Sequence, residues 1–108
     1  MILIFGGAYQ GKLDYALERF EDKKIIRYLD KWILDLVKEN ANVEEAVRQF
    51  IADNSDAVVI CNDISCGVVP VDPVMRKWRE AVGRTLAILS QKSDEVVRLF
   101  CGIPTRLK

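Results

Sequence analysis

The residues best placed to do chemistry lie near the start of the chain, where Gly6, Gly11 and Lys12 follow a short apolar run. This is the spacing of a phosphate-binding loop, G-x-x-x-x-G-K-[ST], that joins a strand to a helix. Glycines let successive backbone N–H groups turn toward phosphate oxygens, and the lysine reaches the terminal phosphates. We therefore predict that a nucleotide binds along the consecutive residues Gly6, Gly7, Ala8, Tyr9, Gln10, Gly11, Lys12 and Leu13.

The last position of this pattern is changed, because Leu13 stands where a serine or threonine hydroxyl would help to bind Mg²⁺. Phosphate affinity can persist without that hydroxyl, whereas metal positioning loses a ligand. The sequence is thus compatible with GTP or ATP as the ligand, puts Mg²⁺ in doubt and identifies no metal-ligating residues. The alternative interpretation is an ordinary glycine-rich turn that caps an edge strand.

Composition limits the class of protein. The 108 residues predict a single domain spanning residues 1–108, and 16 basic residues balance 16 acidic ones. A net charge of zero gives no excess of positive charge that would indicate binding to nucleic acid or to an anionic membrane. The apolar runs are too short to span a bilayer, and the start lacks the basic residues of a secretory signal, so we expect a cytoplasmic protein.

Histidine and cysteine usage bears directly on catalysis. The chain contains no histidine, which excludes a histidine nucleophile or general base. Cys61, Cys66 and Cys101 form no C-x-x-C pair, so we interpret them as reduced, mostly buried thiols rather than as a zinc site.

Segments of strand and helix character alternate along the chain and would position these residues. Apolar or β-branched runs predict strands at 2–5, 25–28, 57–61 and 96–101. Helical spacing predicts helices at 12–20 and 29–37, one capped by Asn42, and a longest one opened by Asp72-Pro73. In that last helix we expect one inward apolar stripe, made of Val74, Met75, Trp78, Ala81, Val82, Leu86 and Leu89.

The alternation favours an α/β fold with a parallel sheet covered by helices on both faces. Ligands of such sheets bind beyond the carboxyl ends of the strands. This rule places four segments along one rim: 6–12, 28–30, 62–67 and 102–106.

Several segments of the second half are more specific. The stretch Asn62-Asp63-Ile64-Ser65-Cys66-Gly67-Val68-Val69-Pro70 is similar to Asn-Glu-Val-Gly-x-Gly-Ile-Val-Pro, and the helix 76–84 to Arg-x-Phe-Arg-Asp-x-x-Gly-Arg. The stretches 93–97 and 102–108 are similar to Ala-Asp-Glu-Val and Gly-x-Pro-x-x-x-Lys. With these segments the chain resembles the adenosylcobinamide kinase / adenosylcobinamide-phosphate guanylyltransferase family, whose loop Gly-Gly-Ala-x-Ser-Gly-Lys-Ser is also similar to residues 6–13.

The resemblance implies a three-layer P-loop NTPase fold of the RecA-like type and a cytosolic enzyme of cobalamin salvage. Such an enzyme phosphorylates a hydroxyl on the aminopropanol arm of adenosylcobinamide. It then transfers GMP to that phosphate through a guanylylated histidine. The resemblance also implies a homo-oligomer.

The chain departs from that family in its middle. The segment 27–37 resembles the family's Asp-Cys-Leu-Thr-x-Trp-Leu-x-Asn-Leu, so Arg27 occupies the position of the acidic Mg²⁺ residue. On this alignment the fold is truncated, because the stretch that carries the nucleophilic histidine is missing before this segment. Guanylyl transfer by the family mechanism is therefore not expected.

The predicted catalytic residues are Lys12, from the loop spacing, and Asp63, from its place on the rim. Asp63, or alternatively Asp30, would supply a substitute carboxylate on the rim; the other interpretation of Asp63 is a loop cap that accepts backbone N–H groups. Arg27 would replace the metal charge by contacting phosphate directly, or else it forms an ordinary salt bridge.

Two functional hypotheses follow. The first is a nucleotide-binding relative of the cobinamide kinases with degraded catalytic parts, which binds nucleotide weakly or binds a partner protein. The second is an active kinase that phosphorylates the hydroxyl of adenosylcobinamide or a related substrate. The expected partners are a nucleotide, a cobinamide-type substrate and a second copy of the chain.

Overall fold

Strands and helices alternate along most of the chain, as the sequence predicts. The computed structural model describes residues 1–8, 10–64 and 71–108. Tyr9 of the predicted loop and residues 65–70, which include Cys66 and Gly67, lie outside the described residues. The elements in chain order are β1 (Ile2–Gly6), α1 (Lys12–Arg19), β2 (Ile25–Ile26), α2 (Leu29–Lys38), α3 (Val43–Asp53), β3 (Val58–Asn62), α4 (Pro73–Lys92), β4 (Glu95–Phe100) and β5 (Ile103–Arg106).

The strands form one sheet in the order β2-β3-β1-β4-β5. β1 lies in the centre and pairs in parallel with β3 and β4, and β2 pairs in parallel with β3. Ile4 is opposite Ile60 on one side and Val97 on the other. The α/β class and the mostly parallel sheet are therefore confirmed.

β5 is the exception, since it runs antiparallel to β4 and was not predicted. Cys101 and Gly102 have φ angles of 52° and 74°, the left-handed backbone that a two-residue hairpin turn requires. The chain therefore reverses instead of leaving the sheet. The prediction that all of 102–106 lies on the ligand-binding rim was wrong, because β5 runs back along β4 and away from that rim. Arg106 pairs with Val97, and its guanidinium lies 3.6 Å from the Glu95 carboxylate at the start of β4.

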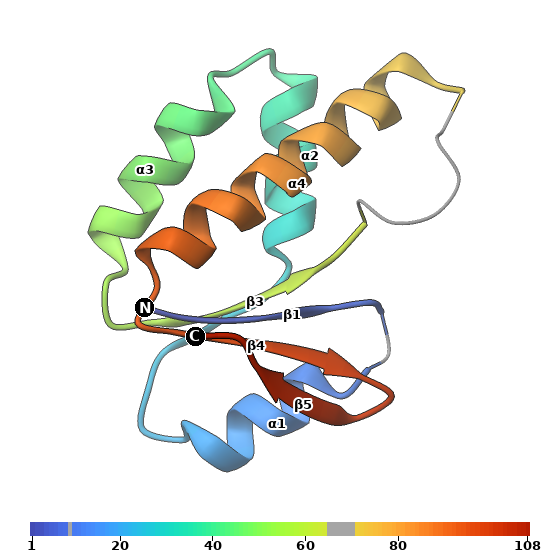
Figure 1. Cartoon of the computed structure of the whole chain (residues 1–108). Coiled ribbons are helices and arrows are strands. Elements are labelled where there is room, and N and C mark those ends of the chain that lie inside the picture. The colour runs from blue at the N-terminus through green and yellow to red at the C-terminus, as the bar shows by residue number, and fades with distance from the viewer. Residues whose placement is uncertain (9, 65–70) are drawn as a thin grey trace.

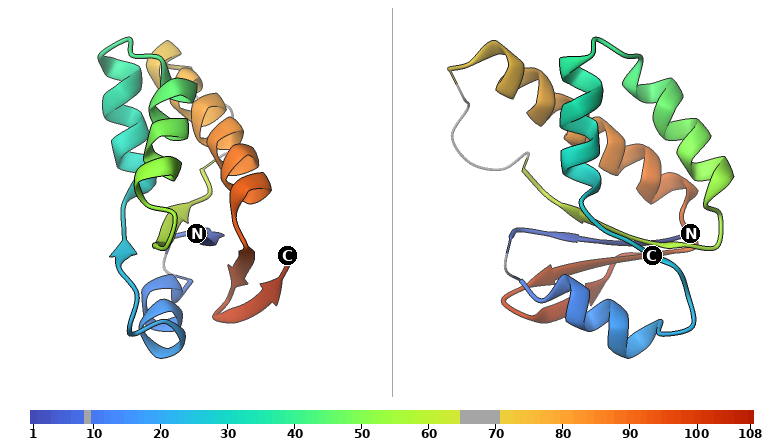
Figure 2. Two further views of the ribbon diagram at one scale, coloured as in Figure 1. Left: turned by 90° about the vertical axis from the view of Figure 1, so that its left-hand side faces the viewer. Right: turned by 180° about the vertical axis from the view of Figure 1, so that it is seen from behind.

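Helices cover both faces of the sheet, but unequally (Figures 1 and 2). α1 lies alone on one face, and α2, α3 and α4 lie together on the other. Side chains along a strand alternate between faces. On the α1 side the buried cluster is Ile4, Ala16, Val58, Ile60, Val97 and Leu99. On the other side it is Met1, Leu3, Leu29, Ile33, Val59, Cys61, Val82, Leu86, Leu89 and Val96.

The predicted helix starts are confirmed by their caps. The Asn42 side chain accepts a hydrogen bond from the Glu45 N–H at 3.1 Å, and the Asp72 side chain accepts one from the Val74 N–H at 2.8 Å. Pro73 occupies the first turn of α4, where its missing N–H costs nothing.

Three local predictions need correction. The strand at 25–28 is shorter, because β2 ends at Ile26 and Tyr28 adopts a left-handed conformation with φ of 62°. Val74 is exposed rather than inward, while Thr85 is buried. Cys61 is buried as expected, but Cys101 is exposed because it lies in the hairpin turn.

Gly6 marks the close approach of two strands at the end of β1. Its φ is 154°, and a Cβ built on it would collide with the carbonyl oxygen of Leu99 in β4. Gly102 also has a positive φ, but a Cβ there would have nothing within 4 Å. The first glycine is thus needed for space, and the second only for its backbone conformation.

We predict that Gly6→Ala lowers the free energy of unfolding by about 3 kcal/mol, because β1 and β4 must separate to admit the methyl group. The matched control Gly102→Ala should cost only about 1 kcal/mol, the penalty of its left-handed φ. Urea denaturation followed by circular dichroism measures both values. Equal losses for the two variants would contradict the steric role of Gly6.

Candidate functional site

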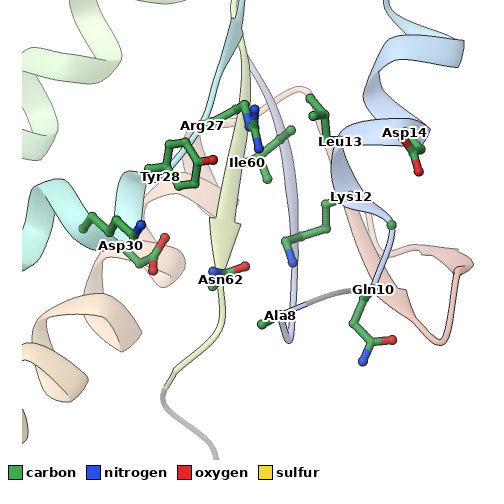
Figure 3. A pocket seen from close by; sticks show the side chains of 12 residues that line it. Ala8, Gln10, Lys12, Leu13, Asp14, Arg27, Tyr28, Asp30, Ile60 and Asn62 are labelled. Carbon is green, nitrogen blue, oxygen red and sulfur yellow. The ribbon is translucent and has the colours of Figure 1, made fainter.

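A cavity of about 550 Å³ opens at the carboxyl ends of β1, β2 and β3, which is a size typical of small-molecule sites. Figure 3 shows it between the start of α1 and the junction of β2 with α2. It is lined by Ala8, Gln10, Gly11, Lys12, Leu13, Asp14, Arg27, Tyr28, Asp30, Lys31, Ile60 and Asn62.

The cavity brings together much of the predicted loop and part of the predicted rim. Within the described residues, Gly6 and Gly7 of the loop are not in its lining, and neither is Asp63. Three lining residues were not predicted as site residues, namely Asp14, Lys31 and Ile60. Ile60 belongs to a predicted strand, along which side chains alternate between the two faces of the sheet. The sequence pattern could therefore have identified Ile60.

The start of α1 faces this cavity without a side-chain cap. Gly11 is the N-cap with φ of 83°, and no side chain bonds to the first turn. The first N–H groups of a helix have no partner within the helix, and they carry the positive end of its dipole. This end of α1 is therefore suited to an anion such as phosphate.

Lys12 is the buried cation of the site. It is only 6% exposed, and its Nζ donates a hydrogen bond to the Gly7 carbonyl oxygen at 2.5 Å, so the side chain folds back on its own loop. Burial lowers the pKa of the Lys12 ammonium, while the nearby Asp30 carboxylate and Cys61 act in the opposite direction. An anion in the cavity would favour the charged form that burial disfavours.

Two further cations lie beside an aromatic ring at the β2–α2 junction. Tyr28 is half exposed and is the N-cap of α2. The Arg27 Cζ lies 4.6 Å and the Lys31 Nζ 4.7 Å from the centroid of the Tyr28 ring. Cation–π attraction holds both side chains at the cavity wall. The left-handed conformation of Tyr28 is what ends β2 and turns the chain into α2.

Asp30 enters the same wall from the first turn of α2 and is only 5% exposed. Its backbone carbonyl accepts a hydrogen bond from the Trp78 Nε1 at 2.7 Å, which fixes the start of α2 against α4. Trp78 thus has a polar contact in addition to its expected core packing.

Asp63 follows the carboxyl end of β3 on the predicted rim, but it is not among the residues that line the cavity. Its backbone N–H donates to the Gly6 carbonyl oxygen at 2.8 Å, which continues the pairing of β1 and β3 past the strand end. Its negative charge helps to raise the pKa of the Cys61 thiol, although burial is the larger cause. A catalytic role for Asp63 stays a prediction.

Gln10 connects the loop to the β4–β5 turn. Its side-chain oxygen accepts a hydrogen bond from the Cys101 N–H. The loop is therefore anchored at both ends: Gly6 lies against β4, and Gln10 is bonded to the turn that follows β4.

A sequence model of the family described as cobinamide kinase / cobinamide phosphate guanyltransferase matches residues 24–107. The chain belongs to this family. The match includes Arg27, Asp30 and Lys31, but the cobinamide kinase / guanyltransferase assignment does not rest on the loop at 6–13, which precedes it. No curated protein matches the chain.

For this family member, the described residues contain no helix that is long and apolar enough to cross a membrane. They also contain no group of three or more cysteine, aspartate or glutamate side chains that would bind a metal ion unaided.

We predict that ATP affinity falls as the pH rises through the lowered pKa of Lys12. Phosphate binds the charged form of Lys12, so the affinity is full below that pKa and is lost above it. The loss occurs at a lower pH than it would with an ordinary lysine, whose pKa is 10.5. Titration calorimetry between pH 7 and about 10 measures this dependence.

The control is Lys12→Arg, whose guanidinium stays charged throughout that range. It should remove the decline in affinity. An affinity of the parent protein that stays constant up to the highest pH would contradict a buried, titrating lysine at the phosphate site.

Proposed function

We propose that this protein binds a nucleoside triphosphate, GTP or ATP, in the cavity between residues 6–13 and the β2–α2 junction. The observation that carries the proposal is the convergence of Lys12, Arg27 and the uncapped start of α1 on one cavity. On this proposal, residues 1–108 form a single, truncated P-loop domain of the RecA-like type.

The charges around the cavity support a polyphosphate ligand. Lys12, Arg27 and Lys31 line it together with the acidic residues Asp14 and Asp30. A guanidinium binds phosphate with paired, charge-assisted hydrogen bonds, and Arg27 needs only to leave the Tyr28 ring to do so. Arg27 would then supply part of the charge compensation that Mg²⁺ supplies in most phosphoryl-transfer sites.

Catalysis is limited by what the chain lacks. With no histidine, the chain cannot form a guanylylated histidine, so guanylyl transfer by that route is not proposed. Family membership and the Asp30 carboxylate in the cavity favour a second candidate function, a kinase for a cobinamide-type hydroxyl in cobalamin salvage.

A cytoplasmic homo-oligomer is the form of the protein that we propose. β5 is an edge strand with every residue exposed, and apolar side chains gather near it. Phe100, Ile103 and Leu107 are 64%, 66% and 57% exposed. Exposed apolar side chains on one edge of a sheet are suited to contact with a second copy.

We predict that calorimetry detects binding of GTP or ATP and that Lys12→Ala weakens it by at least about tenfold, through loss of the buried cation. The control Lys38→Ala changes an exposed lysine at the far end of α2 and should bind as the parent does. Absence of binding by the parent would overturn the proposed function. Parental affinity in Lys12→Ala would overturn the role of the loop.

The kinase is tested separately, by transfer of labelled γ-phosphate from GTP or ATP to adenosylcobinamide. If the second candidate function is right, labelled product accumulates with the parent and falls by at least about tenfold with Lys12→Ala. Nucleotide binding without any labelled product would leave the non-catalytic binding protein as the function.

A further inference from the structure

Asp30 is a buried residue whose carboxylate forms no hydrogen bond or salt bridge with the part of the chain that the structure describes. It is 5% exposed and lines the cavity. Burial of an ionised carboxylate without donors is costly, so native proteins supply a partner or a bound cation.

The nearby cations do not fill this role in the structure. The Lys12 ammonium donates to Gly7, although it lies near enough to Asp30 for their charges to interact. The Arg27 and Lys31 side chains lie against the Tyr28 ring. The Asp30 side chain therefore lies at the cavity (Figure 3) without a bonded cation among the described residues, where a ligand is able to reach it.

The ligand that fits a lone carboxylate beside a polyphosphate site is a divalent cation. Mg²⁺ prefers oxygen ligands and commonly binds through one or two carboxylates, with phosphate oxygens and water completing the octahedron. In Figure 3 the Asn62 amide lies at the end of β3, with Asp30 on one side and Lys12 on the other. Its oxygen is a second suitable ligand, directly or through water.

We propose that Asp30 binds the divalent cation of a metal–nucleotide complex. This inference rests on the proposed function, because the phosphates of the bound nucleotide supply the other ligands of the cation. Leu13 and Arg27 occupy the two metal-associated positions of the family pattern and are unsuited to bind a cation. On this proposal Asp30, in the first turn of α2, binds the cation instead. The cation neutralises the phosphates on the side of the cavity opposite Lys12.

The backbone around Asp30 is fixed before any ligand arrives. Asp30 is in the first turn of α2, its carbonyl oxygen is bonded to Trp78 of α4, and its neighbours Leu29 and Ile33 are buried in the core. A carboxylate on such a rigid element loses little entropy when it binds a cation.

The test is calorimetry with ATP and GTP, in Mg²⁺ and in EDTA, on the parent, Asp30→Asn and Asp35→Asn. For the parent we expect Mg²⁺ to tighten binding by about tenfold. In Asp30→Asn that gain should disappear, and binding in EDTA should become tighter than the parent's, because a negative charge beside the phosphates is gone. Asp35→Asn is the matched control, since Asp35 is an exposed aspartate of the same helix that does not line the cavity, and it should behave as the parent does.

A second readout is the electron paramagnetic resonance signal of Mn²⁺ in place of Mg²⁺. The parent with ATP should convert free Mn²⁺ to a bound form beyond what ATP alone binds, and Asp30→Asn should not. Circular dichroism checks that this variant is folded; if it is not, the parent's own metal dependence decides.

The outcomes separate the two proposals. Equal affinity of the parent in Mg²⁺ and in EDTA overturns the role of Asp30 and leaves nucleotide binding intact. An undiminished Mg²⁺ gain in folded Asp30→Asn has the same consequence. No binding under either condition overturns the proposed function and this inference with it.

Discussion

The parallel pairing of β1 between β3 and β4 determines where every polar group of the cavity lies. Gly6 is opposite Asn62 in this register and packs on the backbone of Leu99, so the loop must begin where two neighbouring strands also end. β2 pairs with β3 in the same direction, which delivers Arg27 and α2 to that edge. One register thus assembles segments that lie far apart in the sequence.

The polar groups gathered there are costly for the folded protein. A lysine and an aspartate are buried at the same cavity, and neither bonds to the other. Proteins keep such arrangements at functional sites, because groups held ready for a ligand are not optimal for stability. The pKa shift of Lys12 is one expression of this cost, and it has the sign that anion binding would reverse.

The sequence was sufficient for most elements but not for the composition of the cavity. Periodicity and the capping residues Asn42 and Asp72 are local signals, so the helices were predicted with nearly correct limits. β5 was missed because Gly102 and Pro104 favour a loop. Gly102 lies in the turn before the strand, and an edge strand tolerates Pro104. The family was recognised from segments that the matched region 24–107 largely contains.

The carboxylate of the site shows why the rest was not predictable. Asp63 directly follows a strand and was therefore the first choice, whereas Asp30, named only as the alternative, has the pattern of a polar residue in the first turn of a helix. Its burial depends on how α2 packs against α4, including the bond from Trp78, which is 48 residues away in the sequence. No local pattern contains that information.

Pro104 has a consequence for how the sheet ends. The Leu107 N–H donates to the Val96 carbonyl, so alternate residues of β5 point their backbone nitrogens at β4, and Pro104 lies at a position that points outward. A proline nitrogen carries no hydrogen, which interrupts the row of donors that another strand would need. The β5 edge of the sheet thus resists the addition of a strand from a neighbouring molecule. Contact between molecules at this edge must rely on side chains.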